Sequence, residues 1–157
     1  MRYVILLQIW VVKLAFPRYW RLPSALVYAQ AKHETGNFKS NIYIENNSLF
    51  GMKVPRKRKT TVKGENRGHA TYSSRISSIY DYFLRQQYFH INYTTVHQYI
   101  NKTKESGYAE DTKYDQSWKA HYDSISPIFR AIPYLFLPSL VVIALFIFRR
   151  DLFDDIF

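Results

Sequence analysis

The hydrophobic positions in the centre of the chain recur at the spacing of helix faces. Between residues 22 and 34, apolar residues stand three and four positions apart on two faces, which predicts a helix buried on most sides. Pro23 suits the first turn of that helix and Gly36 suits its end. The same spacing predicts three further helices, at 76–83, at 96–103 with Thr94 or Thr95 as its cap, and at 114–125.

The helical spacing disappears between residues 52 and 72. Two segments that favour β-structure, 60–62 and 70–72, flank the turn-rich sequence KGENRG at 63–68. This arrangement predicts a β-hairpin. The fold class is therefore α+β, mainly α, with a helical domain at 17–130 that carries a small β-hairpin lobe.

The most abrupt change in the pattern comes at residues 131–148, which are eighteen residues without a charge. A helix of that length spans roughly 27 Å, close to the hydrocarbon thickness of a bilayer, so we expect a single transmembrane helix that contacts lipid. Arg149 and Arg150 begin the short tail at 149–157, and the positive-inside rule places this tail in the cytoplasm and the domain outside it. The alternative is a buried C-terminal helix of the same domain.

Residues 1–16 form a second apolar segment, interrupted by Lys13 and followed by Pro17. No small-residue cleavage site ends this segment, so the pattern does not favour a cleaved signal peptide. We interpret the segment as a first helix that packs on the domain or lies at a membrane interface. An uncleaved signal anchor is the alternative.

Composition narrows the function classes. The chain has 157 residues, a net charge of +10 and no cysteine. The absence of cysteine excludes disulfides, thiolate zinc sites, iron–sulfur clusters and a cysteine nucleophile. An aromatic share of 18% is too apolar for a disordered basic tail. The positive charge favours an anionic partner, which could be nucleic acid, a membrane surface or a polymer of the cell envelope.

Much of the positive charge falls between residues 53 and 67, where seven basic residues stand against Glu65 alone. We interpret this basic segment as a means of attraction to an anionic envelope. Nucleic-acid binding is an alternative that we do not expect, and a solvated loop is the third interpretation. The basic residues are Lys53, Arg56, Lys57, Arg58, Lys59, Lys63 and Arg67.

Glu34 is the strongest candidate for a catalytic residue. It ends an apolar helix face and precedes the loop sequence TGNF, which would expose its carboxyl group at a cleft. Partial burial raises the pKa of a carboxyl group, and a carboxylic acid that keeps its proton near neutral pH can protonate the leaving oxygen of a glycosidic bond. The alternative is a structural carboxylate paired with a cation.

Four segments of the chain resemble, in the same order, the glucosaminidase family of peptidoglycan hydrolases, which are glycoside hydrolases also described as mannosyl-glycoprotein endo-β-N-acetylglucosaminidase-like. The resemblance covers about residues 22–125. The segments are LPSALVYAQAKHETGNF at 22–38, NNSLFGMK at 46–53, YSS at 72–74 followed by SIYDY at 78–82, and GYAEDTKY at 107–114.

The resemblance implies a lysozyme-like fold in which a helical body and a small β-lobe enclose a groove for the glycan strand. It also implies that Glu34 is the general acid and that Tyr72 is a tyrosine of the cleft on which activity depends. The residues implied to bind the sugar are Asn47, Ser48, Phe50, Gly51 and Tyr108.

Glu65 is the local candidate for a second carboxylate, because where the family uses one it comes from the β-lobe. A solvated turn residue is the alternative interpretation. The sequence also departs from the family pattern. Ser48 stands where asparagine is common, and His69 and Ala70 stand where an aromatic residue and an arginine often precede the tyrosine.

The expected function is that of an endo-β-N-acetylglucosaminidase that cleaves the β-1,4 bond after N-acetylglucosamine in peptidoglycan. Water would be activated by Glu65, or the substrate's acetamido group would assist while Tyr72 stabilises the transition state. We expect no metal and no cofactor, since no second histidine stands four residues after His33, as a zinc-hydrolase motif requires, and no phosphate loop is present. The alternative is a catalytically silent glycan-binding or docking protein. A phage lysin carried by the virion is a further hypothesis.

Overall fold

The computed structural model of the protein describes residues 2–127 and 129–130. The expected transmembrane segment at 131–148 and the tail at 149–157 lie outside the described residues. The elements in chain order are α1 (Arg2–Lys13), the 3-10 helix η1 (Pro17–Tyr19), α2 (Ser24–Glu34), α3 (Asn41–Asn46), β1 (Gly64–Asn66), β2 (His69–Thr71), α4 (Arg75–Tyr88), α5 (Val96–Thr103), the π-helix η2 (Lys104–Tyr108) and α6 (Tyr114–Asp123).

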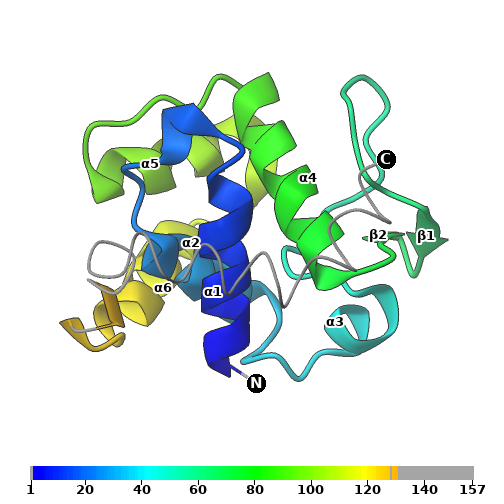
Figure 1. Cartoon of the computed structure of the whole chain (residues 1–157), viewed down its shortest axis with the longest axis horizontal. Coiled ribbons are helices and arrows are strands. Elements are labelled where there is room, and N and C mark those ends of the chain that lie inside the picture. The colour runs from blue at the N-terminus through cyan, green and yellow to red at the C-terminus, as the bar shows by residue number, and fades with distance from the viewer. Residues whose placement is uncertain (1, 128, 131–157) are drawn as a thin grey trace.

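The described part is a mainly helical domain with one small antiparallel sheet of two strands, as the sequence predicts. Figure 1 shows most of the helices gathered on one side and α3 beside the β-hairpin on the other. Helix α2 lies at the centre and packs against α1 and α6. Its apolar side chains are buried on more than one face, as expected.

The N-terminal helix α1 packs against α2 and α4. Ile5, Ile9 and Val12 are almost fully buried and belong to the same core cluster as the apolar side chains of α2. The first apolar segment is thus a helix that packs on the domain, one of the two placements that we expected for it. Among the helices that the structure describes, none has the length and apolar character that a membrane crossing requires.

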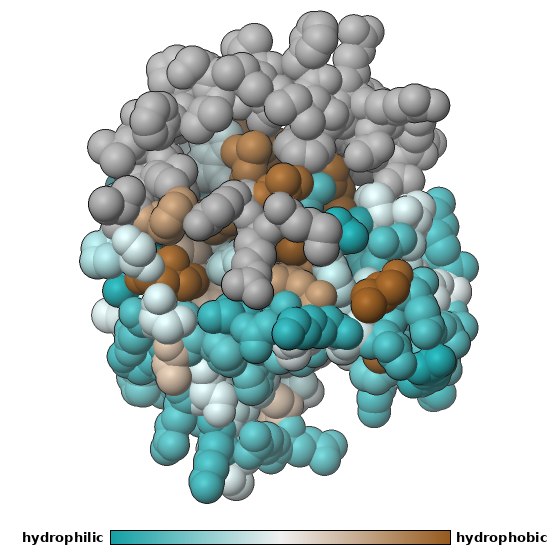
Figure 2. Space-filling view, turned by 90° about the horizontal axis from the view of Figure 1, so that it is seen from below, coloured by the Kyte–Doolittle hydropathy of each residue, from teal (hydrophilic) through white to brown (hydrophobic). Residues whose placement is uncertain are grey.

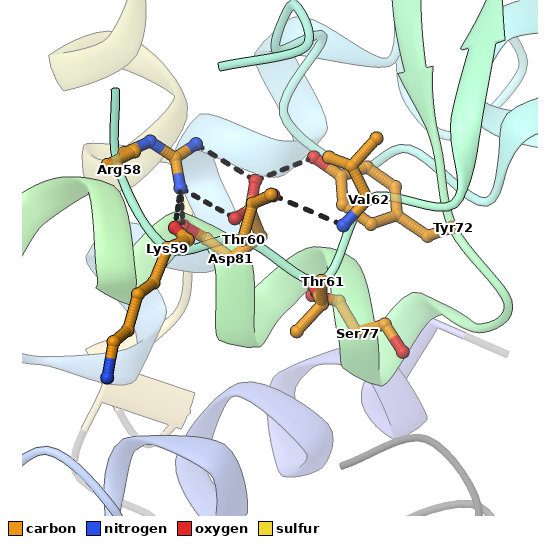
Figure 3. Close-up of polar contacts among 8 residues, drawn as sticks. All are labelled: Arg58, Lys59, Thr60, Thr61, Val62, Tyr72, Ser77 and Asp81. Carbon is orange, nitrogen blue, oxygen red and sulfur yellow. Dashed lines mark hydrogen bonds and ion pairs between the residues drawn. The ribbon is translucent and has the colours of Figure 1, made fainter. Parts of the chain in front are cut away.

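The first strand of the hairpin lies later in the chain than expected. Strand β1 pairs with β2 so that Glu65 faces Ala70, and the connecting residues Arg67 and Gly68 have φ angles of 54° and 74°. Two successive positive φ angles define the tight turn that suits the twist of paired strands, and this turn fixes which residues can pair. The expected strand at 60–62 instead lies beside α4, where Thr61 Oγ1 donates to the backbone oxygen of Ser77 at 2.7 Å (Figure 3).

Short-range hydrogen bonds define several helix ends. Thr95 caps α5, since its side chain accepts from the backbone nitrogen of Gln98, and Ser40 caps α3 in the same way. Helix α3 is not predicted from the sequence. Its six residues are too few to show a helical repeat.

Buried hydrogen bonds join α4 to α5 and α6 to α2. Gln86 Nε2 on α4 donates to the hydroxyls of Tyr99 and Thr103 on α5 at 2.8 and 3.0 Å. Trp118 Nε1 on α6 donates to the backbone oxygen of Leu26 at 2.8 Å. These bonds fix α5 against the end of α4 and α6 against α2, the helix that ends at the candidate site.

The described surface in Figure 2 is mainly hydrophilic and carries separate hydrophobic patches. Isolated exposed hydrophobic residues are normal, whereas residues that gather at a cleft can contact a ligand. The large hydrophobic residues exposed in the described part are Val4, Trp20, Ile44, Val54, Tyr88 and Phe89.

Candidate active site

A cleft of about 770 Å³ lies where the end of α2 meets the loop after α3. The end of α4 and the segment around η2 complete its lining. Residues that are far apart in the sequence therefore share one open surface. The lining consists of Glu34, residues 50–58, Arg85, Tyr88, Phe89, residues 106–108 and Glu110.

Glu34 is the last residue of α2 and its carboxyl group faces this cleft. The helix stops there because Thr35 Oγ1 donates to the backbone oxygen of Ala31 and accepts from the backbone nitrogen of Phe38. This side chain closes the loop onto the helix end, and Gly36 continues the chain with a φ of 54°. The sequence TGNF thus ends the helix at Glu34 and leaves this residue at the cleft, as expected.

One hydrogen bond orients the Glu34 carboxyl group, and its second oxygen has space beside it. Tyr114 donates its hydroxyl hydrogen to Glu34 Oε1 at 2.5 Å, and a Cβ placed on Gly51 would lie 3.5 Å from Glu34 Oε2. Gly51 therefore leaves open space beside the second oxygen. Burial raises the pKa of Glu34 from 4.5 to about 7, and the hydrogen bond from Tyr114 opposes part of that rise. The group can hold and release a proton near neutral pH.

Tyr114 is itself oriented by Gln30. The Nε2 atom of Gln30 donates to the Tyr114 hydroxyl oxygen at 2.8 Å, so the hydroxyl hydrogen is free to point at Glu34. Both side chains are buried. Neither residue is predicted from the sequence to have a role in the site, because each fits a helix face that predicts core packing.

The structure places Tyr72 in a different set of contacts. Its side chain is buried, and its hydroxyl donates to Asp81 Oδ2 at 3.0 Å rather than to Glu34. Asp81 also accepts two hydrogen bonds from Arg58, at 2.6 and 2.9 Å (Figure 3). Burial and the Asp81 carboxylate raise the pKa of Tyr72 far above its ordinary value. Tyr72, Asp81 and Arg58 form a buried polar cluster, and of the three only Arg58 also lines the cleft.

Three of the five expected sugar-binding residues line the cleft with Glu34. They are Phe50, Gly51 and Tyr108. Tyr108 donates its hydroxyl hydrogen to the backbone oxygen of Phe50 at 2.7 Å, which holds η2 against the start of the loop. The ring of Phe50 stacks on Tyr82 with centroids 4.2 Å apart, so its backbone rather than its side chain fixes the cleft edge.

The other two residues, Asn47 and Ser48, are outside the cleft lining. Asn47 follows the last residue of α3 with a φ of 52° and donates from Nδ2 to the backbone oxygen of Tyr72 at 3.1 Å. Ser48 is buried, and within the described part of the chain its hydroxyl has no hydrogen-bond partner. The Asn47 side chain thus joins the end of α3 to the segment that precedes α4.

Glu65 is exposed on β1 and does not line the cleft, so the structure does not bring it together with Glu34. The second carboxylate of the cleft lining is Glu110, which is also exposed. In the sequence, Glu110 is marked only as part of the segment at 107–114 that resembles the family. Across the residues that the structure describes, no group of three histidine, aspartate or glutamate residues could hold a metal ion.

Arg85 is another lining residue, and no sequence pattern marks it. Its guanidinium group lies 4.6 Å from the ring centroids of both Phe89 and Tyr108 and donates to Ser106 Oγ at 2.9 Å. Cation–π contacts on two rings stabilise a buried guanidinium group. Arg85 thereby joins the end of α4 to η2.

A glutamic acid that is partly buried, hydrogen-bonded and able to hold and release a proton near neutral pH in an open cleft is suited to a glycoside hydrolase. A protein-family model described as mannosyl-glycoprotein endo-beta-N-acetylglucosaminidase matches residues 17–126 of the chain. The chain belongs to this glucosaminidase family, and the family implies a glycosidase of peptidoglycan. No curated protein and no solved structure matched the chain.

Proposed function

We propose that the protein is an endo-β-N-acetylglucosaminidase that hydrolyses the β-1,4 bond after N-acetylglucosamine in peptidoglycan, with Glu34 as the general acid. The observation that carries the proposal is the Glu34 carboxyl group, which faces the cleft with a pKa of about 7. As the bond breaks, the proton of Glu34 passes to the glycosidic oxygen of the leaving sugar.

The attack on the sugar carbon needs a second group. Glu65 does not line the cleft, and this placement favours assistance by the substrate's own acetamido group over water activation by Glu65. In that route the acetamido oxygen attacks the sugar carbon, and water then opens the cyclic intermediate after giving its proton to the Glu34 carboxylate. A direct contribution of Tyr72 to the transition state requires its hydroxyl to exchange Asp81 for the substrate.

The test uses the full chain and purified peptidoglycan. Release of products with reducing N-acetylglucosamine by the wild type, lost in Glu34→Gln, supports both the reaction and the acid. Glu105→Gln is the matched control, because Glu105 is an exposed glutamate outside the cleft lining and its variant should keep full activity.

Other outcomes decide against the proposal. Products with a reducing N-acetylmuramic acid end would show that the protein cleaves the other glycosidic bond of the strand. Binding of glycan strands without any release of reducing ends would favour the catalytically silent docking protein. Full activity in Glu34→Gln would remove Glu34 from the role of acid.

We also propose that the protein works at a membrane, anchored through residues 131–148 with the cleft outside the cytoplasm. The support is the uncharged run of eighteen residues followed by Arg149 and Arg150. Recovery of the chain from purified virions would identify the protein as a phage lysin carried by the virion. Recovery from host membranes alone would locate it in the cell envelope.

A further inference from the structure

The cleft that contains Glu34 has a strongly basic lining. Among its described residues are five basic side chains and two acidic ones, Glu34 and Glu110. Glu34 is close to half protonated at neutral pH, because its pKa is about 7. The lining therefore attracts anions.

Two of the five basic side chains already have partners inside the protein. Arg58 is neutralised by the two hydrogen bonds that it donates to Asp81. Arg85 is buried between Phe89 and Tyr108 and bonded to Ser106. Neither guanidinium group is free to bind a ligand without breaking these contacts.

The remaining three basic side chains are Lys53, Arg56 and Lys57, and all three are exposed at the cleft. In the part of the chain that the structure describes, none of the three forms an ion pair with a carboxylate of the protein. Their charge is therefore available to a ligand in the cleft.

The loop that carries these three residues is held at both ends. Before them, the backbone oxygen of Met52 accepts a hydrogen bond from the backbone nitrogen of Ala70 at 2.8 Å. After them, Arg58 is bound to Asp81 on α4 (Figure 3). Figure 1 shows the loop between α3 and β1 rising beside α4. The three cations are thus presented from a segment with two fixed ends.

The same cleft carries an exposed aromatic pair. Tyr88 and Phe89 lie at the end of α4 and meet edge to face, with ring centroids 5.1 Å apart. Aromatic faces offer apolar contact area to the faces of sugar rings, and lysine and arginine form charge-assisted hydrogen bonds with carboxylates. A polymer of sugar rings that carries carboxylates matches both features together.

We propose that Lys53, Arg56 and Lys57 form a specificity subsite for the carboxylates of an acidic glycan strand. Because of this subsite, the protein binds carboxylate-bearing β-1,4 glycan more tightly than neutral glycan of the same length. This inference rests on the proposed function, since it takes the glycan strand as the ligand of the cleft. The carboxylate belongs to the lactyl ether of the muramyl sugar or to a stem peptide attached to it.

The test measures binding separately from hydrolysis, with the full chain carrying Glu34→Gln so that the ligand stays intact. The three probes are a neutral oligomer of N-acetylglucosamine, a muramyl oligosaccharide without stem peptides and the same oligosaccharide with them. Isothermal titration calorimetry at low and high salt gives each dissociation constant. We expect the acidic glycan to bind about tenfold more tightly than the neutral oligomer at low salt, with the difference shrinking as salt rises.

The decisive variant combines Lys53→Gln, Arg56→Gln and Lys57→Gln. It should abolish the preference for acidic glycan and leave the affinity for the neutral oligomer unchanged. The charge-matched control combines Arg18→Gln, Lys39→Gln and Lys102→Gln, three positions outside the cleft lining, and should keep the preference.

Equal affinity of the Glu34→Gln protein for acidic and neutral glycan would overturn the inference. An equal loss in the control variant, or equally tight binding of a DNA oligonucleotide of the same charge, would mean general attraction of polyanions and would also overturn it. A preference already seen without stem peptides assigns the lactyl carboxylate, and one seen only with them assigns the peptide. If the Glu34→Gln protein prefers acidic glycan but the wild type does not cleave peptidoglycan, the proposed reaction fails and the subsite stands.

Discussion

At the scale of single residues, the protonation of Glu34 depends on opposing contributions from its neighbours. Burial favours the neutral acid, whereas the hydrogen bond from Tyr114 favours the carboxylate. Gly51 adds no side chain beside Oε2, so a sugar oxygen can approach the acid there. Burial has the larger effect, so the pKa of Glu34 stays raised and the residue can donate a proton near neutral pH.

We expect the activity to fall as pH rises through about 7, because the general acid must be protonated to act. Tyr114→Phe removes the hydrogen bond that favours the carboxylate, so the pKa of Glu34 rises and the midpoint of this fall moves to higher pH. Initial rates of peptidoglycan cleavage, measured across the neutral range from mildly acidic to mildly alkaline buffers, give the midpoint for each protein. An unchanged midpoint in Tyr114→Phe would contradict the assignment.

Stability gives an independent check on the same group. The pKa of Glu34 is raised from 4.5 to about 7 on folding, so its contribution to stability is present at acidic pH and is lost as pH rises through about 7. Glu34→Gln removes this dependence and should raise the free energy of unfolding on the order of 1–3 kcal/mol above neutral pH. Urea unfolding of both proteins at acidic and alkaline pH measures the difference. A variant that is no more stable at alkaline pH would speak against a buried acid.

The sequence predicts Glu34 because a local signal marks it, namely an apolar helix face that ends in a glutamate and a glycine-containing loop. The partners of Glu34 have no such signal. Gln30 and Tyr114 are 84 positions apart, and each alone fits a packed helix. In the sequence, Asp81 is an acid on a helix and Arg58 is one of many basic residues, until the fold brings them together. Hydrogen bonds over such separations depend on tertiary packing, which a single sequence does not display.

At the scale of elements, the ion pair between Arg58 and Asp81 joins the basic loop to α4, and both side chains are shielded from solvent. Arg58→Met leaves the Asp81 carboxylate buried without its cation and should lower the free energy of unfolding by about 3–5 kcal/mol. Arg58→Met combined with Asp81→Leu should regain most of that loss, although the hydroxyl of Tyr72 then lacks its acceptor. Urea unfolding measures both variants.

A second ion pair supplies the control for this prediction. Arg67 and Glu45 meet at 3.2 Å, and their side chains are 54% and 40% exposed. Replacing Glu45 with glutamine should change the free energy of unfolding by less than about 1 kcal/mol, since water screens exposed pairs. An equally small effect of Arg58→Met would show that the loop is not fixed by its ion pair.

The elements differ in how far the sequence predicts them. Helices α2, α4, α5 and α6 show a repeated apolar spacing, and each lies near its expected position. The shift of β1 arises because β-propensity alone marked 60–62, while the positive φ angles at Arg67 and Gly68 determine the pairing. Turn geometry thus decides the register of so short a hairpin.

At the scale of the whole molecule, membrane anchoring through residues 131–148 is a prediction separate from catalysis in the cleft, and it can be tested by itself. We expect the full chain to sediment with membranes and to resist alkaline extraction. Val142→Arg should weaken this association, because a charged residue at the middle of a spanning helix disfavours insertion by about 2.5–3.5 kcal/mol. Membrane fractionation followed by immunoblotting measures the outcome.

Ile44→Arg is the matched control for the membrane prediction. Ile44 is an exposed apolar residue of α3, so the variant introduces the same charge at a site that contacts water. Its partition should equal that of the wild type. A wild-type chain recovered only in the soluble fraction would contradict the anchor.

Helix α1 bears on how the protein can be divided for experiments. The family match begins at residue 17, yet Ile5, Ile9 and Val12 supply part of the core beneath α2 and α4. Cutting the chain at the edge of the family match would uncover this apolar surface and leave a cavity in its place. The smallest fragment worth expressing is therefore larger than the region that matches the family. An inactive fragment that starts at residue 17 would reflect the loss of α1 rather than a lack of activity in the protein.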